Sequence, residues 1–305
     1  MKIHVIANPY SRRGNGKDLL RILWEKFADT RVHIHRTDDP SHATELARRA
    51  VLEGADTIVA GGGDGTVNAV LNGIVGSGVA LGIIPSGTAN DLASYHRIPG
   101  DVVSACDIIR ARRLQPVDLV RVNGWCYATT GGLGLPAEVA SQANALKRRT
   151  GVSKLLALLL GSHVYGLTAL RLLPWVCRDS NPIEIRRPDG ATLRTDAVAF
   201  LVANQPFIGA RFVVAPRASN VDGKFDVCLI ENPKNFLCVA SILMNFFLNK
   251  DTTSPWVRAW CAEHLVVTAE RPMAFLGDGE TTQEGSYFEI GVLPRALNLI
   301  VPRHV

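Results

Sequence analysis

Residues 56–74 read DTIVAGGGDGTVNAVLNGI, and this stretch decides the fold. The apolar run 57–60 has the length of a buried strand, and a helical pattern over 67–74 follows the glycines directly. Successive glycines let backbone N–H groups approach an anion closely, and the start of the next helix adds partial positive charge. Asp64 would repel a phosphate, so a magnesium ion or a substrate hydroxyl is its expected companion. A tight turn without a ligand is the alternative interpretation.

The same alternation of strand and helix extends to both sides of this turn. Strands are expected at 3–7, 32–35, 57–60 and 80–84, and helices at 16–27, 41–52, 67–74 and 101–112, with Ser41 as the N-cap of the second helix. This order predicts a parallel sheet covered by helices, with the ligand site outside the carboxyl ends of the strands. The polar residues that follow the four strands should therefore converge: Asn8, Ser11, Thr37, Asp64, Thr66, Ser86, Thr88, Asn90 and Asp91. Each of them is also typical of a helix cap or turn.

After about Pro116 the pattern changes to strands, at 117–122, 125–129, 183–186, 197–203, 225–230 and 265–269. Apolar helical patterns are inserted near 153–173 and 234–249. We therefore predict an α/β domain at 1–120 followed by a mostly β domain at 121–288, with the active site in a cleft between them. The apolar stretches 155–176 and 236–248 belong to the core, line an acyl-chain pocket or touch a bilayer.

Composition narrows the class of protein. The chain has 305 residues, of which 47% are hydrophobic and 20% charged, as expected of a packed soluble protein. A net charge of +5 favours phosphorylated ligands or anionic membranes, whereas the scattered basic clusters lack the aromatic platform of a nucleic-acid site. The six cysteines form no zinc pattern and are expected to be mostly buried thiols. With no secretory signal and no uninterrupted apolar span, a cytoplasmic location is expected.

Several common nucleotide and hydrolase motifs are absent. Residues 14–18 read GNGKD, which lacks the leading glycine and the Ser/Thr of a P-loop, and no G-x-G-x-x-G occurs at the first turn. H-E-x-x-H, G-x-S-x-G and the H-R-D motif are also missing. These absences argue against P-loop and Rossmann sites, the commonest hydrolases and protein kinases.

Five motifs occur in a shared order: NPYS at 8–11, GGDGTVN at 62–68, PSGTANDLA at 85–93, DG at 222–223 and DGE at 278–280. In this order the chain resembles the diacylglycerol kinase catalytic-domain family, which includes bacterial soluble lipid kinases, sphingosine kinases and ceramide kinases. The resemblance spans nearly the whole chain, although GGDGT alone is shared with NAD kinases and some relatives of phosphofructokinase. It implies ATP-dependent phosphorylation of a lipid hydroxyl, a nucleotide-binding first domain and a β-sandwich-like second domain. The last residues, 289–305, would return to the first domain.

The resemblance also implies roles for individual residues. ATP would be bound by Asn8, Pro9, Tyr10, Ser11, Arg12, Thr37, Gly62, Gly63, Asp64, Gly65, Thr66, Thr88 and Asn90. Asp64 and Asp91 would organise Mg²⁺, and Glu280 would accept the proton. Asp64 and Asp278 would be catalytic residues as well. A second, structural Mg²⁺ would be held by Asp222 and the carbonyls of Ser219 and Lys224. A plain Asp-Gly turn is the alternative, since Lys224 adds a cation there.

We therefore expect a magnesium-dependent lipid kinase that works at the inner membrane surface, with diacylglycerol as the leading acceptor. A sphingoid base, phosphatidylglycerol or an isoprenoid glycerol lipid fits the motifs equally well. An NAD-kinase-like enzyme is disfavoured by residues 85–91 and 278–280. A non-catalytic nucleotide- or lipid-binding regulator is the alternative from another class, and a homodimer is left open.

Overall fold

The computed structural model describes residues 1–8, 16–37, 39–148, 163–179, 181–209, 212–250 and 253–303. The chain forms two compact units. Unit 1 comprises Met1–Leu119, Cys126–Ala128 and Leu293–Val305, and unit 2 comprises Val120–Trp125 and Thr129–Val292.

The centre of unit 1 is a parallel sheet. Its strands are β1 (Lys2–Ala7), β2 (Arg31–Arg36), β3 (Thr57–Gly62), β4 (Ala80–Pro85) and the end of the long strand β15 (Glu280–Ile300). The order is β15-β4-β3-β1-β2, and every neighbouring pair is parallel. The carboxyl ends of β1 to β4 therefore meet at one edge, because parallel strands point the same way.

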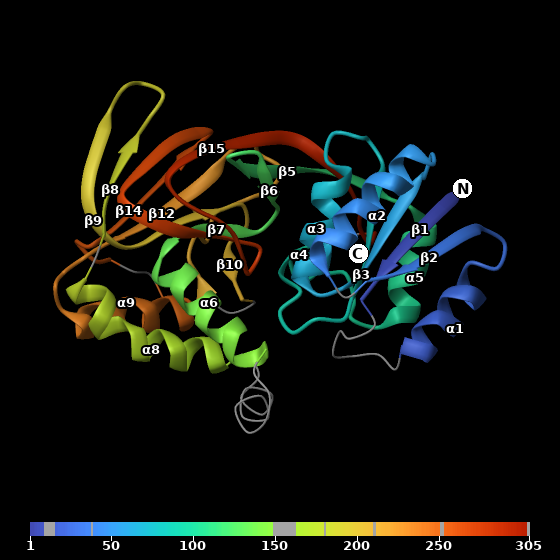
Figure 1. Ribbon diagram of the computed structural model, residues 1–305, viewed down its shortest axis with the longest axis horizontal. Helices are drawn as coiled ribbons and strands as arrows, with labels where there is room; N and C mark the ends of the chain where they lie inside the picture. Colours follow the sequence, from blue (N-terminus) through green and yellow to red (C-terminus); the bar gives the residue numbers. More distant parts are fainter. Residues whose placement is uncertain are drawn as a thin grey trace. The chain divides into compact units, whose positions relative to one another are not determined.

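Helices cover both faces of this sheet (Figure 1). They are α1 (Gly16–Lys26), α2 (Pro40–Leu52), α3 (Asp64–Ile74), α4 (Asp91–Tyr95) and α5 (Val102–Ala111). Successive strand residues face opposite sides, so Ile58 packs in the core under α2 and α3 whereas Val59 packs in the core under α1 and α5. The predicted N-cap of α2 is wrong: the carboxylate of Asp39, not Ser41, accepts the backbone N–H groups of Ser41 and His42.

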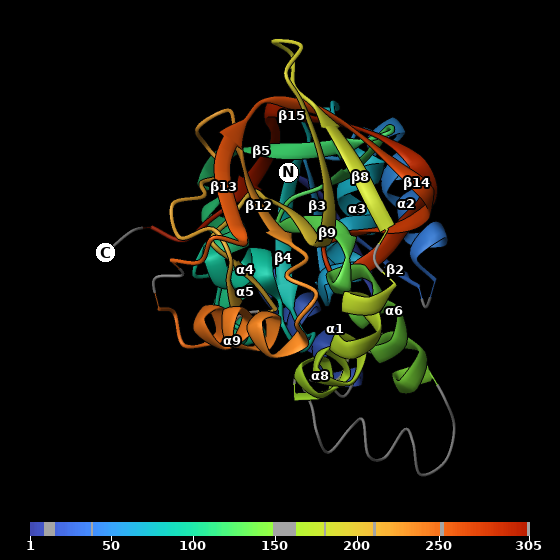
Figure 2. The ribbon, with the colours of Figure 1, turned by 90° about the vertical axis from the view of Figure 1, so that its left-hand side faces the viewer.

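Unit 2 is mostly antiparallel. Two strands are shared with unit 1, β5 (Leu114–Val122) and β6 (Trp125–Tyr127). The others are β7 (Thr130–Gly134), β8 (Asn181–Arg186), β9 (Thr192–Ala203), β10 (Phe207–Ile208), β11 (Phe212–Val213), β12 (Phe225–Glu231), β13 (Val257–Ala262), β14 (His264–Gly277) and the first part of β15. The main order is β13-β12-β9-β7-β14-β15, and β8 pairs with both β9 and β14. Figure 2 shows these strands from a second side.

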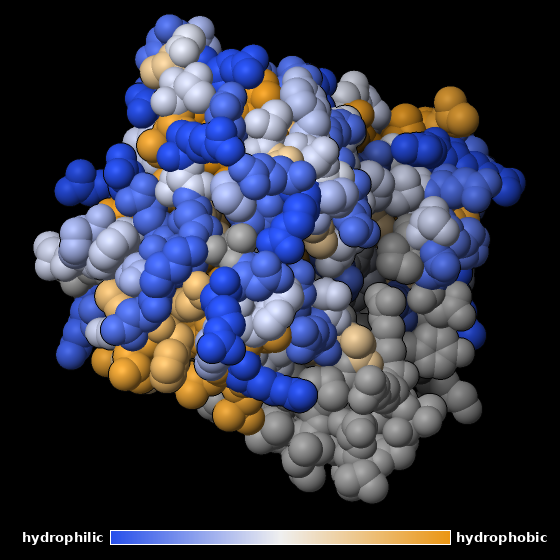
Figure 3. All heavy atoms as spheres, turned by 60° about the vertical axis from the view of Figure 1, so that its left-hand side comes forward, coloured by the Kyte–Doolittle hydropathy of each residue, from blue (hydrophilic) through white to orange (hydrophobic). Residues whose placement is uncertain are grey.

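The described residues of unit 2 include the helices α6 (Leu135–Arg148), α8 (His163–Arg178) and α9 (Phe236–Phe247). Their buried side chains share one core with β9 and β12. Apolar side chains also gather on the outer surface of this region (Figure 3). Among the described residues, no helix is long and apolar enough to cross a membrane.

The α/β plus β fold class predicted from the sequence is confirmed. Helix α6 and strand β7 were not predicted, and β7 is unusual because three of its five residues are glycine, a residue that disfavours strands. The helical pattern near 153–173 is observed only from His163 onward, since 149–162 lie outside the described residues. The cysteines are free thiols, four of them buried, and Cys261 is the exposed exception.

Candidate active site

The aspartate of the glycine turn ties two loops of unit 1 together. One carboxylate oxygen of Asp64 accepts the backbone N–H of Asn90 at 2.9 Å, and the other accepts the backbone N–H of Asp91 at 2.7 Å. Asp64 begins α3, directly after β3, whereas Asn90 and Asp91 follow β4 and begin α4. A charged acceptor bonded to two backbone donors is a strong link, so Asp64 holds the 85–91 loop against the glycine turn.

Two glycines permit this close approach. A Cβ on Gly87 would lie 2.5 Å from the Cα of Gly63, and a Cβ on Gly63 would lie 3.1 Å from the Cα of Gly87. Gly62 is equally constrained, because a side chain there would overlap the buried Thr66. Only residues without a side chain fit where the two loops meet.

Asn90 shapes its own loop. It adopts a left-handed conformation with φ of 52°, which asparagine tolerates better than most residues. Its side-chain oxygen accepts the N–H of Gly87 at 2.9 Å, and its amide donates to the carbonyl of Gly87 at 3.1 Å. Exposed Thr88 lies within this closed loop.

The other predicted residues of this edge follow β1 and β2. The N–H of Asn8 donates to the carbonyl of Gly61 at 2.9 Å, and that of Thr37 donates to the carbonyl of Ala7 at 3.0 Å. The buried Thr37 hydroxyl donates to the carbonyl of Asp39 at 2.8 Å, so this side chain serves the turn that begins α2. Pro9, Tyr10, Ser11 and Arg12 lie outside the described residues.

This edge of unit 1 fits a phosphate group and a magnesium ion. The N-cap of α3 is Gly63, which supplies no side-chain cap, so the positive end of this 11-residue helix is not closed by its own N-cap side chain. The Asp64 carboxylate accepts the backbone N–H of Asp91, so the two acidic residues belong to neighbouring turns of this edge. Among the described residues no three His, Cys, Asp or Glu side chains form a metal cluster. Mg²⁺ is usually bound by one or two carboxylates together with phosphate oxygens and water, and it does not need a site made of protein ligands alone.

The second group of predicted residues lies in unit 2, at the turn between β14 and β15. Asp278 and Gly279 both have positive φ, 51° and 81°, as a two-residue hairpin of type I′ requires. The buried carboxylate of Asp278 accepts the backbone N–H of Thr129 at 2.8 Å and its hydroxyl at 2.6 Å. Asp278 therefore anchors the turn, and the half-buried Glu280 is the first residue of β15.

Sequence reasoning missed the residues that surround this anchor. Thr129, Thr130, Asn204 and Gln205 are all buried polar residues of unit 2. The N–H of Asn204 donates to the carbonyl of Thr129 at 2.7 Å, and the Thr130 hydroxyl donates to the carbonyl of Phe207 at 3.2 Å. The available signal was the TTGG sequence at 129–132, where two threonines precede glycines in a strand.

The predicted structural metal loop is an Asp-Gly turn. The carboxylate of exposed Asp222 accepts the backbone N–H of Lys224 at 3.1 Å, and Gly223 has a φ of 75°. Burial raises the pKa of the neighbouring Asp226, and the Asp222 carboxylate adds to this effect. Magnesium at this turn stays a prediction.

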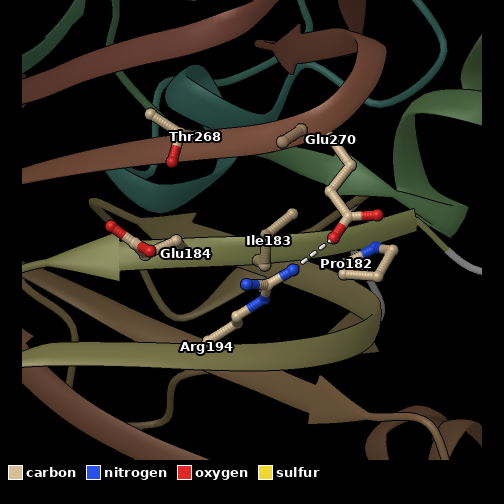
Figure 4. A pocket seen from close by; sticks show the side chains of 7 residues that line it. Pro182, Ile183, Glu184, Arg194, Thr268 and Glu270 are labelled. Carbon is tan, nitrogen blue, oxygen red and sulfur yellow. Dashed lines mark hydrogen bonds and ion pairs between the residues drawn. The ribbon is translucent and has the colours of Figure 1, made fainter.

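A cavity of about 180 Å³ in unit 2 is separate from all of these residues. Residues of β8, β9 and β14 line it, and Arg194 and Glu270 form an ion pair of 2.5 Å there (Figure 4). It contains none of the predicted site residues.

The fold and the joined glycine turns define a class of phosphate-handling α/β enzyme. The family model of the diacylglycerol kinase catalytic domain matches residues 2–122, and that of the YegS C-terminal NAD kinase beta sandwich-like domain matches residues 132–301. The chain therefore belongs to the diacylglycerol kinase catalytic-domain family and is a lipid kinase, a phosphotransferase.

Individual relatives agree with this assignment. A diacylglycerol kinase of Bacillus subtilis is 31% identical over 250 residues, which cover 80% of this chain and 78% of the relative. The crystal structure of a diacylglycerol kinase from Bacillus anthracis superposes with a TM-score of 0.77 at 22% identity, over 99% of this chain and 97% of that one. Yeast NADH kinase, solved with NADH, has a TM-score of 0.51 at 12% identity over 98% of this chain and 82% of its own. The last two show a shared fold.

Proposed function

We propose that this kinase transfers the γ-phosphoryl group of ATP to the free hydroxyl of diacylglycerol, which yields phosphatidic acid and ADP. The observation that carries the proposal is the Asp64 link, which joins the glycine turn and the 85–91 loop at the start of α3. The name of the B. subtilis relative supports diacylglycerol as the acceptor.

Within unit 1, the glycine turn and the start of α3 would hold the triphosphate. Gly62, Gly63 and Gly65 would present backbone N–H groups to the phosphates, and Thr66, Thr88 and Asn90 belong to the same two loops. Asn8 and Thr37 lie after the neighbouring strands β1 and β2. Asp64 and Asp91 would hold Mg²⁺, which when bound neutralises charge on the β- and γ-phosphates.

In the transfer, the lipid oxygen forms a bond to the γ-phosphorus as the bond from that phosphorus to the bridging oxygen of ADP breaks. The hydroxyl proton goes to the carboxylate of Glu280. Asp278 is a positioning residue in this scheme, because its carboxylate is engaged by Thr129 and fixes the turn that precedes Glu280. Diacylglycerol dissolves in membranes, so the reaction would take place at the surface of the inner membrane.

The test is transfer of label from γ-labelled ATP, with Mg²⁺, into a total lipid extract that is resolved by chromatography. Wild type should label phosphatidic acid, and Glu280→Gln should lower the rate by at least 100-fold because general base catalysis is removed. Glu284→Gln is the matched control, since Glu284 is an exposed carboxylate on the same strand. Label in a different lipid would refute diacylglycerol as the acceptor, and full activity of Glu280→Gln would refute its role.

A further inference from the structure

Helices α8 and α9 are apolar on their exposed faces as well as on their buried ones. The buried faces, which include Leu172, Val176, Val239 and Ile242, belong to the core of unit 2 with β9 and β12. A soluble helix normally pairs one apolar face with a polar face outside. A second apolar face therefore indicates that something covers these helices in use.

The exposed apolar residues form stripes along both helices. On α8, Leu167, Leu170 and Trp175 are 56%, 65% and 52% exposed. On α9 and just after it, Leu237, Met244 and Leu248 are 64%, 52% and 49% exposed. Leu170 and Trp175 follow Leu167 by three and eight residues, and Met244 and Leu248 follow Leu237 by seven and eleven, so each set lies along one side of its helix. Pro174, Phe236 and Phe247 are exposed beside these residues.

The two stripes belong to one surface, because α8 packs against α9. Both helices lie side by side in Figure 1, and Figure 3 shows apolar atoms gathered over the same part of unit 2. We call this surface, made by the six residues with the exposures given above, the α8/α9 face. Large contiguous apolar patches on a protein surface mark interaction sites.

The charged residues of these two helices indicate which kind of partner covers the exposed apolar side chains. Neither α8 nor α9 contains an aspartate or glutamate, and Arg171 and Arg178 are exposed on the same side of α8 as the apolar stripe. Within the described part of the chain neither arginine forms an ion pair. A twofold contact between two copies of this face would bring arginines together without a carboxylate from either helix. An anionic lipid surface complements both the apolar stripes and the arginines.

We propose that the α8/α9 face is the surface by which this protein binds an anionic phospholipid bilayer, with Leu170, Trp175 and Met244 inserted among the lipids and Arg171 and Arg178 at the headgroups. The proposal rests on the proposed function in one respect: a diacylglycerol acceptor resides in the bilayer that this face would bind.

The first test measures sedimentation of the protein with vesicles of phosphatidylglycerol and phosphatidylcholine. The triple variant Leu170→Ser, Trp175→Ser, Met244→Ser should bind at least tenfold more weakly than wild type, because its apolar contacts with the lipid are lost. The control variant Trp24→Ser, Leu52→Ser removes exposed apolar side chains from unit 1 and should bind as wild type does. Equal binding by the triple variant and wild type would overturn the proposal.

A charge variant provides a second test that does not change the apolar residues. Arg171→Gln with Arg178→Gln should lose about tenfold in affinity for phosphatidylglycerol vesicles at low salt. Its binding to pure phosphatidylcholine vesicles should stay the same. An unchanged preference for the anionic lipid would contradict the assignment of these arginines to the headgroups.

Activity on a dispersed short-chain diacylglycerol separates this proposal from the proposed function. The triple variant should phosphorylate the dispersed substrate at the wild-type rate and lose activity on vesicles. If wild type binds vesicles through this face but phosphorylates no diacylglycerol, the proposed function fails and the docking proposal stands. If light scattering shows a wild-type dimer that the triple variant breaks while vesicle binding is unchanged, a second copy covers the face and the docking proposal is wrong.

Discussion

Replacing Gly87 by alanine perturbs the contact on which the proposed nucleotide site depends. The new Cβ would lie 2.5 Å from the Cα of Gly63 and 2.8 Å from the side-chain oxygen of Asn90, whereas ordinary contacts begin at 3.4 Å. Gly87 is not among the residues with positive φ, so the substitution adds no backbone strain of its own. The two loops must instead separate by about 1 Å, and a displacement of that size in a catalytic site costs about 100-fold in rate. Overpacking of this kind costs about 1–3 kcal/mol of folding free energy.

The assays are thermal unfolding, calorimetric titration with ATP and Mg²⁺, and the initial rate of label transfer to diacylglycerol. We expect kcat/KM to fall about 100-fold and ATP to bind at least tenfold more weakly in a variant that is still folded. Gly285→Ala is the control, because a Cβ on Gly285 would meet no atom within 4 Å and the residue has no positive φ. If Gly87→Ala binds ATP and turns over within about twofold of wild type, the two loops do not form the nucleotide site.

Three further predictions follow from named contacts. Asp64→Asn leaves one of two backbone amides without its acceptor, so the free energy of unfolding should fall by about 1–3 kcal/mol. The rate of label transfer should fall at least tenfold. The control Glu263→Gln, at an exposed residue, should change neither quantity. Thr129→Val removes the 2.6 Å bond to Asp278 and should lower kcat with KM for ATP unchanged; an unchanged kcat would exclude the positioning role of Asp278. Burial is the main cause that lowers the pKa of His4 from 6.5 to about 4, and charge repulsion from His33 and His35 adds to it. Between pH 4 and pH 6.5 the unfolded chain therefore binds more protons than the folded protein. The contribution of His4 to the free energy of unfolding should therefore be fully present above pH 7 and fall by roughly 2 kcal/mol as the pH drops towards 4. Denaturant unfolding of the His4→Phe variant should not show this pH-dependent loss.

The sequence predicted the parallel part of the fold well because its signals are local. Each strand of unit 1 is a short apolar run, and the glycine turn marks the junction of β3 and α3 without reference to any distant residue. The predicted boundaries of the strands and helices agree with the observed ones within a few residues. The N-cap of α2 is Asp39 and not the predicted Ser41, because both residue types suit that position.

The parts that were not predicted depend on contacts far apart in the sequence. Asp64 was expected to work on a metal or proton, and its carboxylate also binds the backbone 26 and 27 residues further on. Asp278 was expected to be a catalytic residue, and its hydrogen-bond partner Thr129 lies 149 residues earlier in the chain. Residue spacing and hydrophobic periodicity cannot predict hydrogen bonds between residues so far apart in the sequence. The glycines of β7 likewise weakened the strand signal in a segment that pairs with both β9 and β14.

The most direct test of the central claim is a crystal structure of the protein with Mg²⁺ and a non-hydrolysable ATP analogue. We expect the triphosphate to lie at the start of α3, against Gly62–Thr66 and the 86–90 loop, with the metal bound by Asp64 or Asp91 directly or through water. A triphosphate bound elsewhere on the chain, with these loops empty, would contradict the account.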